Sequence, residues 1–409
     1  MHKFLFIIAF ILLIPIATHS QPKTLVFKAQ TMGGNILPIT KNITNINPNP
    51  SLGGELAIEF PSWYEHPWQQ YLGEPTLGVG FVGLDLGNNK ILGQAFALYP
   101  YLLIDIVKTP HFELNWKIGA GLSFFNKTYN RCDTIPANFN SATTNTLIGS
   151  IVNVYLTTGA NLNFPITKTF ALHAELGYMH MSNGSVLQPN GGINMIYASI
   201  GATYKIDKNY NHSNHTKEKI FSSFPYQWSI NITGSGGYRE LYYLDNKGYG
   251  VGSLHVGATY NIGNWYALGG SLDAFYDGVF NQQGAGYKEH TRFGRYIILN
   301  ENLSNKFRVA ISVNNEFKMG KITAILDWGI YLYDPIRLAY TDSNGNKYTK
   351  RPILYKYNIE KEDGWNYFRL GVRCQVWDNI YLQTTVKTHL SKAEMVEWGV
   401  GYQIPFKKK

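Results

Sequence analysis

The chain has 409 residues and a formal net charge of +9, with 15% aromatic residues, only 15% charged residues, 40 glycines and 29 tyrosines. This composition excludes a low-complexity chain and is typical of a transmembrane β-barrel, which needs aromatic girdles and many turns. The positive charge suits phosphorylated lipid as well as nucleic acid, and the export signal at the N-terminus argues against nucleic acid.

Residues 1–20 have the pattern of a secretory signal peptide. A short basic start at His2 and Lys3 precedes the apolar run Phe4–Ile16, and the small residues Thr18 and Ser20 offer a cleavage site. The run is shorter than the roughly 18 apolar residues that a membrane-spanning helix needs. We therefore expect an exported chain without a helical anchor.

About sixteen segments alternate with a period of two, a number typical of outer-membrane barrels. In the first half the predicted strands lie near Thr24–Ile36, Glu55–Pro61, Thr76–Leu86, Ile91–Val107, His111–Phe125, Leu147–Phe164, Thr169–Ser182 and Asn194–Ile206. In the second half they lie near Tyr226–Gly234, Gly252–Ile262, Trp265–Tyr276, Phe307–Lys318, Ile322–Tyr333, Tyr367–Val376, Ile380–Ser391 and Met395–Phe406. We predict an all-β, transmembrane antiparallel β-barrel protein.

The connections between these strands alternate in length. Tight turns fall at 108–110, 165–168, 261–264, 319–321 and 377–379, and long polar loops fall at 126–145, 277–305 and 334–365. Outer-membrane barrels are built in this way, with the long loops outside the cell. A soluble β-sandwich would not need that alternation.

The two halves also look like repeats. The first ends in Gly201–Ile206 and the second in Gly401–Phe406, with similar spacing of glycine and apolar residues. We therefore divide the mature chain into an eight-strand repeat at 21–207, a polar linker at 208–223 and a second eight-strand repeat at 224–409. Tandem barrels and one wide barrel both fit this pattern.

Three polar residues continue the apolar row at one rim of the predicted sheet. Successive strand side chains point to opposite faces, so His180 and Ser182 share a face with the apolar residues before them. Asn194 belongs to the same row on the next strand. Polar groups placed against hydrocarbon cost free energy and usually mark function. The apolar residues of that row are Phe170, Leu172, Ala174, Leu176 and Tyr178, whereas His173 and Glu175 occupy the other face.

These residue types suit acyl transfer. Ser182 is the candidate nucleophile, His180 the base that takes its proton, and Asn194 the group that orients the imidazole. The loop that follows would supply amide donors for an oxyanion, from the backbone of Asn183 and Gly184 or from the Asn190 side chain. The alternative interpretation is that these are interfacial polar residues at the edge of the apolar band.

The wider motif resembles the lipid A 3-O-deacylase family. It consists of His180-x-Ser182-Asn183, the pair Pro189-Asn190 that ends eight residues past the serine, and the two paired strands on either side. The resemblance implies an eight-stranded outer-membrane barrel that hydrolyses an acyl ester of lipopolysaccharide, and longer members with an added C-terminal half are called acyloxyacyl hydrolases. It also implies that His180 is the base, Ser182 the nucleophile and Asn190 the motif asparagine.

The chain departs from this family at one position. The family's acid lies twelve residues past the serine, and that position is Asn194 here. An amide can hold an imidazole, but in a serine triad it lowers turnover by about 10⁴. Glu175 cannot substitute, because its side chain points to the opposite face of the strand. We therefore expect slow or absent turnover.

For two other candidate groups a structural role is favoured over a functional one. His389-x-Ser391 followed by Glu397 repeats the motif in the second half, but parity points it inward, where a lumen hydrogen-bond network is expected. A catalytic site in the lumen is the alternative, since the three side chains could meet there. His212 and His215 have the spacing of metal ligands without a supporting cysteine or carboxylate. We expect no metal and no cofactor.

The sequence thus predicts an outer-membrane ester hydrolase that removes an acyl chain from lipid A. A non-catalytic barrel is the alternative, either a porin-like channel or a structural surface protein. It is favoured by inward polar rows such as Gln383, Thr385 and Lys387, since one wide barrel would enclose a water-filled lumen.

Overall fold

The computed structural model describes residues 24–38, 46, 48–61, 67–130, 144–207, 226–240, 247–263, 265–281, 303–334, 352–357, 364–390 and 392–407. The expected signal peptide, the linker 208–223 with its two histidines, and Ser391 lie outside these residues. In the described part of the chain, no helix has the length and apolar character needed to cross a membrane.

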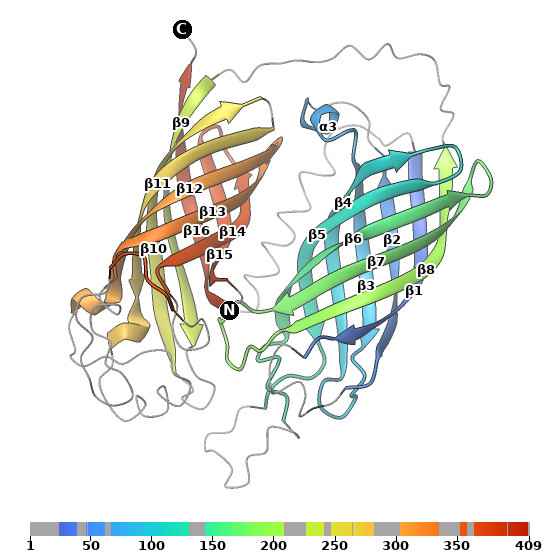
Figure 1. Cartoon of the computed structure of the whole chain (residues 1–409), viewed down its shortest axis with the longest axis horizontal. Helices are drawn as coiled ribbons and strands as arrows, with labels where there is room; N and C mark the ends of the chain where they lie inside the picture. The colour runs from blue at the N-terminus through green and yellow to red at the C-terminus, as the bar shows by residue number, and fades with distance from the viewer. Residues whose placement is uncertain are drawn as a thin grey trace. The chain divides into compact units, whose positions relative to one another are not determined.

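The first eight strands form one closed antiparallel barrel (Figure 1). Each strand pairs with the next, and the first strand also pairs with the eighth, which closes the sheet. The strands are β1 (Thr24–Ile36), β2 (Ser51–Phe60), β3 (Thr76–Asp85), β4 (Gln94–Lys108), β5 (Glu113–Phe125), β6 (Val152–Pro165), β7 (Phe170–Ser182) and β8 (Ile193–Asp207).

The last eight strands form a second closed antiparallel barrel. Its first strand pairs with both the second and the last. The strands are β9 (Tyr226–Glu240), β10 (Gly248–Ile262), β11 (Tyr266–Asp277), β12 (Phe307–Met319), β13 (Ile322–Tyr333), β14 (Asn366–Gln375), β15 (Ile380–His389) and β16 (Lys392–Lys407). The predicted fold class is therefore confirmed, and of the two arrangements that fitted the sequence the protein adopts two barrels.

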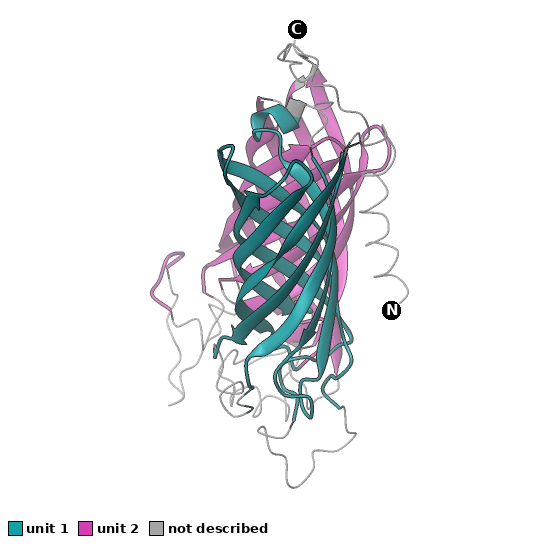
Figure 2. Ribbon diagram, turned by 90° about the vertical axis from the view of Figure 1, so that its right-hand side faces the viewer, with its two compact units in different colours: residues 1–183, 189–220 teal, residues 184–188, 221–409 magenta. Residues whose placement is uncertain are grey.

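The chain divides into two compact units, shown in teal and magenta in Figure 2. One comprises residues 1–183 and 189–220, and the other comprises residues 184–188 and 221–409. The first thus contains β1–β8 and the second contains β9–β16, together with a short segment of the β7–β8 connection.

Side chains on each strand alternate between an exposed outer surface and a buried lumen. On the first barrel the outward rows are strongly apolar, with Leu52, Leu176 and Ile200 more than 60% exposed. The inward rows are polar and aromatic, and the fully buried Tyr99, Tyr155 and Lys117 belong to them. Eight-stranded barrels are just wide enough for side chains to fill.

The lumen of the second barrel is filled in the same way, by charged residues in pairs. Arg369 lies 3.0 Å from Asp273, and Arg373 lies 2.8 Å from Glu316. In the described residues of both barrels the inward rows are buried polar, charged and aromatic side chains, as expected for eight strands. The inward polar rows that favoured a porin are lumen contacts.

Local differences from the predicted strands have physical causes. β9 continues to Glu240, beyond the predicted end at Gly234. The low strand propensity of Gly236 and Gly237 favours a turn there, but pairing with β10 and β16 holds the segment extended. β6 begins at Val152 rather than near residue 147. The preceding apolar segment is a buried loop, in which Asn145 Oδ1 accepts the N–H groups of Leu147 and Ile148. Short helices not predicted from the sequence are α3 (Pro67–Tyr71), η2 (Gly278–Asn281) and η3 (Leu303–Lys306).

Candidate active site

The candidate triad lies where β7 ends and β8 begins. His180 and Asn194 are directly opposite each other in the ladder between these strands. Ser182 follows two residues later on β7, at the same parity as His180. The alternation of the two strands therefore positions all three side chains on one face, as the sequence predicted.

The three side chains form a continuous hydrogen-bonded series. His180 Nδ1 lies 2.7 Å from Asn194 Oδ1, and His180 Nε2 lies 2.9 Å from Ser182 Oγ. A carbonyl oxygen only accepts, so Nδ1 carries the proton and donates it to Asn194. In the neutral imidazole Nε2 is then an acceptor, and Ser182 Oγ–H donates to it. This is the arrangement that a general base needs before it can activate a hydroxyl.

Tyr178 joins this series although its role was not predicted. Its hydroxyl donates to Asn194 Oδ1 at 2.5 Å. Tyr178 lies on the outward row two residues before His180, so the same parity that found the histidine brings its side chain to Asn194. The sequence read it as one more apolar member of the row, because tyrosine is common on barrel exteriors.

Hydrogen bonds of two asparagine side chains, Asn183 and Asn190, hold the loop after Ser182 in place. Asn190 Oδ1 accepts the backbone N–H of Asn183 at 3.1 Å. The Asn183 side chain donates to Ser150 Oγ at 3.0 Å, which ties this loop to the β5–β6 connection. Gly184 has a φ of 64° and begins the segment 184–188, so it falls in the second unit whereas the other five candidates lie in the first.

Gly192 packs beside the candidate triad and was also not predicted. Its φ is 69°, in the left-handed region that favours glycine. A Cβ at this position would lie 3.4 Å from both His180 Cε1 and Ser182 Cβ. Its N–H donates to the Leu147 carbonyl at 3.0 Å, which fixes the start of β8. In the sequence, the position of Gly192 just before a predicted strand is the one feature that indicates a glycine with a special backbone conformation.

Glu175 takes no part in the outward series. It lies in the lumen of the first barrel, where it accepts from Tyr197 Oη at 2.5 Å and lies 3.2 Å from Lys117 Nζ. The same lysine lies 3.1 Å from Glu55. The expectation that Glu175 cannot replace the missing acid is consistent with this position.

In the second barrel, His389 and Glu397 of the repeated motif have different partners. His389 Nε2 lies 2.8 Å from Glu394, and its Nδ1 donates to the Asn366 carbonyl at 2.9 Å. Glu397 instead lies 3.6 Å from Arg369 Nε. Both carboxylates are buried in the lumen. His389 therefore belongs to an inward polar network, as expected, and its partner is Glu394 rather than Glu397.

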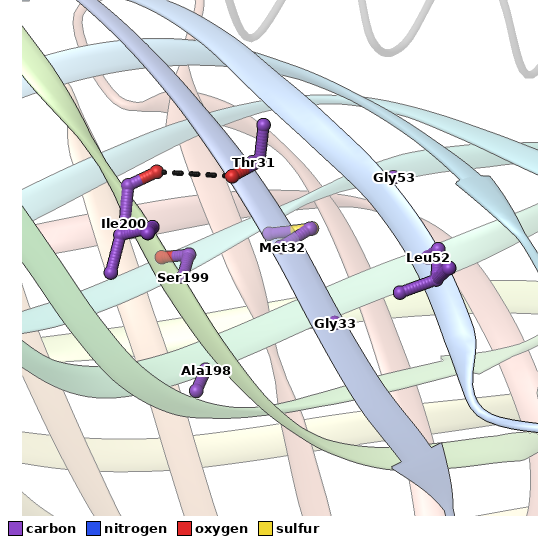
Figure 3. A pocket seen from close by; sticks show the side chains of 8 residues that line it. All are labelled: Thr31, Met32, Gly33, Leu52, Gly53, Ala198, Ser199 and Ile200. Atoms are coloured by element: carbon purple, nitrogen blue, oxygen red, sulfur yellow. Dashed lines mark hydrogen bonds between the residues drawn. The ribbon is translucent and has the colours of Figure 1, made fainter.

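A shallow hollow of about 410 Å³ lies on the first barrel across β8, β1 and β2 (Figure 3). Gly33 and Ala198 face each other there, and Leu52 and Ile200 border it. Its lining carries no titratable side chain, so it offers a surface for apolar contact. Ala198 is on the outward row of β8, four residues or about 13 Å along the strand from Asn194.

Two family models match the chain. The model described as lipid A 3-O-deacylase (PagL) matches residues 52–203. The model described as acyloxyacyl hydrolase, C-terminal domain, matches residues 228–349 and 353–408. The two matches together take in most of both barrels.

Several solved structures are similar to the chain. The crystal structure of the outer membrane enzyme PagL has 15% sequence identity and a TM-score of 0.28, covering 44% of this chain and 98% of that one. Neisserial surface protein A has 9% identity and a TM-score of 0.27, covering 45% and 97%. The N-terminal β-barrel domain of Pseudomonas aeruginosa OprF has 15% identity and a TM-score of 0.24, covering 46% and 100%. No curated protein matches the chain.

Proposed function

This chain belongs to the lipid A 3-O-deacylase family, in the long form with an acyloxyacyl hydrolase C-terminal domain, and on that premise we propose that it removes an acyl chain from lipid A in the outer membrane. The observation that carries the proposal is the hydrogen-bonded series from Ser182 through His180 to Asn194. It lies on the outward row of the first barrel, where Ser182 (9% exposed) and Asn194 (8% exposed) are buried and His180 is half-buried. We infer that the acyl ester enters the series from this apolar outer face.

The geometry supports a two-step acyl transfer. Ser182 Oγ attacks the ester carbonyl while His180 Nε2 takes the hydroxyl proton, which gives a tetrahedral intermediate. When this collapses, the sugar oxygen leaves with the proton from Nε2 and the acyl group remains on Ser182. Water then attacks the acyl-enzyme with His180 again as the base. The fatty acid leaves and the serine is restored.

Two further groups support the chemistry. With its oxygen toward the ring, Asn194 accepts from the imidazole tautomer that can take the serine proton. It carries no charge to stabilise the imidazolium, so turnover is slower than with a carboxylate. The loop 183–190 supplies the oxyanion donors, from the backbone near Gly184 and the Asn190 side-chain nitrogen.

The substrate acyl chain would follow the outward face from Ser182. One leaflet of a bilayer has a hydrocarbon depth of about 15 Å. The hollow at Ala198 and Gly33 lies about 13 Å along β8 from Asn194, within that depth. An acyl chain placed there would contact apolar side chains over most of its length.

Lipid A composition in cells tests this proposal. Cells that express the full chain should contain lipid A that has lost one acyl chain, as measured by mass spectrometry. Cells that express Ser182→Ala at the same level, and correctly inserted in the outer membrane, should contain unmodified lipid A. Equal deacylation in the two strains would show that Ser182 is not the nucleophile.

The non-catalytic barrel is the weaker alternative. A porin needs an open lumen, and both lumens are filled by buried polar and charged side chains. A purely structural barrel would give no reason for Ser, His and Asn to stand in series on a surface that contacts lipid.

A further inference from the structure

The tautomer of His180 depends on the orientation of the Asn194 side-chain amide, which has its oxygen toward the imidazole in this structure. If its oxygen faces His180, the imidazole carries its proton on Nδ1 and accepts from Ser182. If its nitrogen faces His180, the imidazole must accept at Nδ1 and carry the proton on Nε2. Ser182 would then be only an acceptor and could not be activated. A carboxylate in the same place accepts with either oxygen and has no such ambiguity.

Nothing within the three residues decides between these arrangements. The imidazole has two neutral tautomers, and a serine hydroxyl both donates and accepts. Each orientation of the amide therefore gives a complete set of hydrogen bonds from Asn194 to Ser182. A fourth group must select the productive one.

The hydroxyl of Tyr178 is that fourth group. It lies 2.5 Å from Asn194 Oδ1, on the same oxygen that accepts from His180. With the amide reversed, Tyr178 would accept from the Asn194 nitrogen, and its own O–H would lose Asn194 Oδ1, its one hydrogen-bond acceptor among the residues that the structure describes. Tyr178 lies on the outward row, and an unpaired O–H against hydrocarbon is costly.

We propose that Tyr178 is a positioning residue that selects the oxygen-inward orientation of Asn194, and thereby the tautomer of His180 that activates Ser182. This positioning role of Tyr178 is needed only in a chain that has an amide at the acid position. The prediction for turnover rests on the proposed function, and the prediction for the tautomer does not. Tyr178 acts through Asn194 and does not contact the reacting atoms.

The tautomer of His180 tests the proposal without any need for turnover. In histidine-labelled full-length protein in detergent, the ¹⁵N chemical shifts of the imidazole report which nitrogen carries the proton, and His180→Gln identifies the signals. The wild-type protein should show the proton on Nδ1. Tyr178→Phe removes one oxygen and should shift the population toward the form protonated on Nε2. Unchanged populations in Tyr178→Phe would overturn the proposal.

A double-mutant cycle tests the same idea through turnover of an acyl ester. Tyr178→Phe should lower kcat by roughly threefold to tenfold with little change in KM, the effect of losing one hydrogen bond that acts on the base. In the Asn194→Glu background it should change kcat by less than about twofold, because a carboxylate needs no orientation. Equal losses in both backgrounds would mean that Tyr178 acts on folding or on substrate instead.

Tyr204→Phe is the matched control. Tyr204 lies on the outward row of β8, near the opposite end of the strand, and is 53% exposed. Its substitution should change neither the tautomer nor kcat. If the wild-type protein hydrolyses no ester, the proposed function fails while the tautomer measurement still decides the role of Tyr178.

Discussion

Replacement of Asn194 tests the central polar contact of the site in both directions. Its Oδ1 accepts two hydrogen bonds, from His180 Nδ1 at 2.7 Å and from Tyr178 Oη at 2.5 Å. Each is worth about 0.5–1.5 kcal/mol net, so Asn194→Leu removes about 1–3 kcal/mol of positioning. If all of it is lost from the transition state, hydrolysis slows by roughly fivefold to 150-fold.

Asn194→Glu should have the opposite effect. A hydrogen bond to a charged acceptor is worth about 1–2 kcal/mol more than a neutral one, and the carboxylate also stabilises the imidazolium. The stronger hydrogen bond alone should raise the hydrolysis rate by roughly fivefold to thirtyfold. The upper limit is the factor of about 10⁴ by which an amide at the acid position slows serine triads.

The assay compares initial rates on a soluble chromogenic ester and on lipid A, with purified full-length protein in detergent. Asn35→Leu is the control, because Asn35 is an exposed residue of β1 that pairs with Ile196 and lies outside the series. The reasoning is refuted if the wild type, Asn194→Leu and Asn194→Glu hydrolyse both substrates at the same rate.

Three further perturbations have defined outcomes. Gly192→Ala should cost about 1–3 kcal/mol of stability, because alanine is strained at the positive φ of 69°. It should also lower kcat, because relief of that strain shifts the backbone at the start of β8, where the new Cβ would be in ordinary van der Waals contact with His180 and Ser182. Gly320→Ala, with a similar φ of 67° and nothing within 4 Å of the new Cβ, should lower stability alone. An unchanged kcat in Gly192→Ala would contradict this coupling of the backbone to the triad. Lys117→Met should destabilise the first barrel by about 3–5 kcal/mol in a urea titration, because Glu55 and Glu175 lose a buried partner. Lys108→Met is the control and should cost less than about 1 kcal/mol, because the side chain of Lys108 is 62% exposed in its ion pair with Glu113. In planar bilayers the full-length protein should carry no steady ion current, and a reproducible conductance would show that a lumen is open.

Much of the fold follows from the sequence because strand alternation is a local property. The period of two placed all sixteen strands, and it also placed His180, Ser182 and Asn194 on one outward row. Whether the sixteen strands close as one barrel or as two did not follow from the alternation. The pairing of β1 with β8, and of β9 with β16, is a long-range choice of partner that no local pattern encodes.

The parts of the site that were missed depend on contacts rather than on pattern. Tyr178 looked like any outward tyrosine until the register set it beside Asn194. Gly192 looked like a loop residue until its positive φ and its neighbours were visible. The inward network of His389 was expected, but its partner Glu394 was not named, because Glu394 and Glu397 both follow His389 closely and only the three-dimensional arrangement separates them.

The most direct test of the account is to find the acyl group on the enzyme. Full-length protein mixed with a long-chain acyl ester and quenched in acid should yield a peptide that contains Ser182 and is heavier by one acyl group. His180→Gln should greatly reduce its formation, and Ser182→Ala should abolish it. Ester hydrolysis that proceeds with the acyl group on a different residue, or that persists in Ser182→Ala, would contradict the central claim.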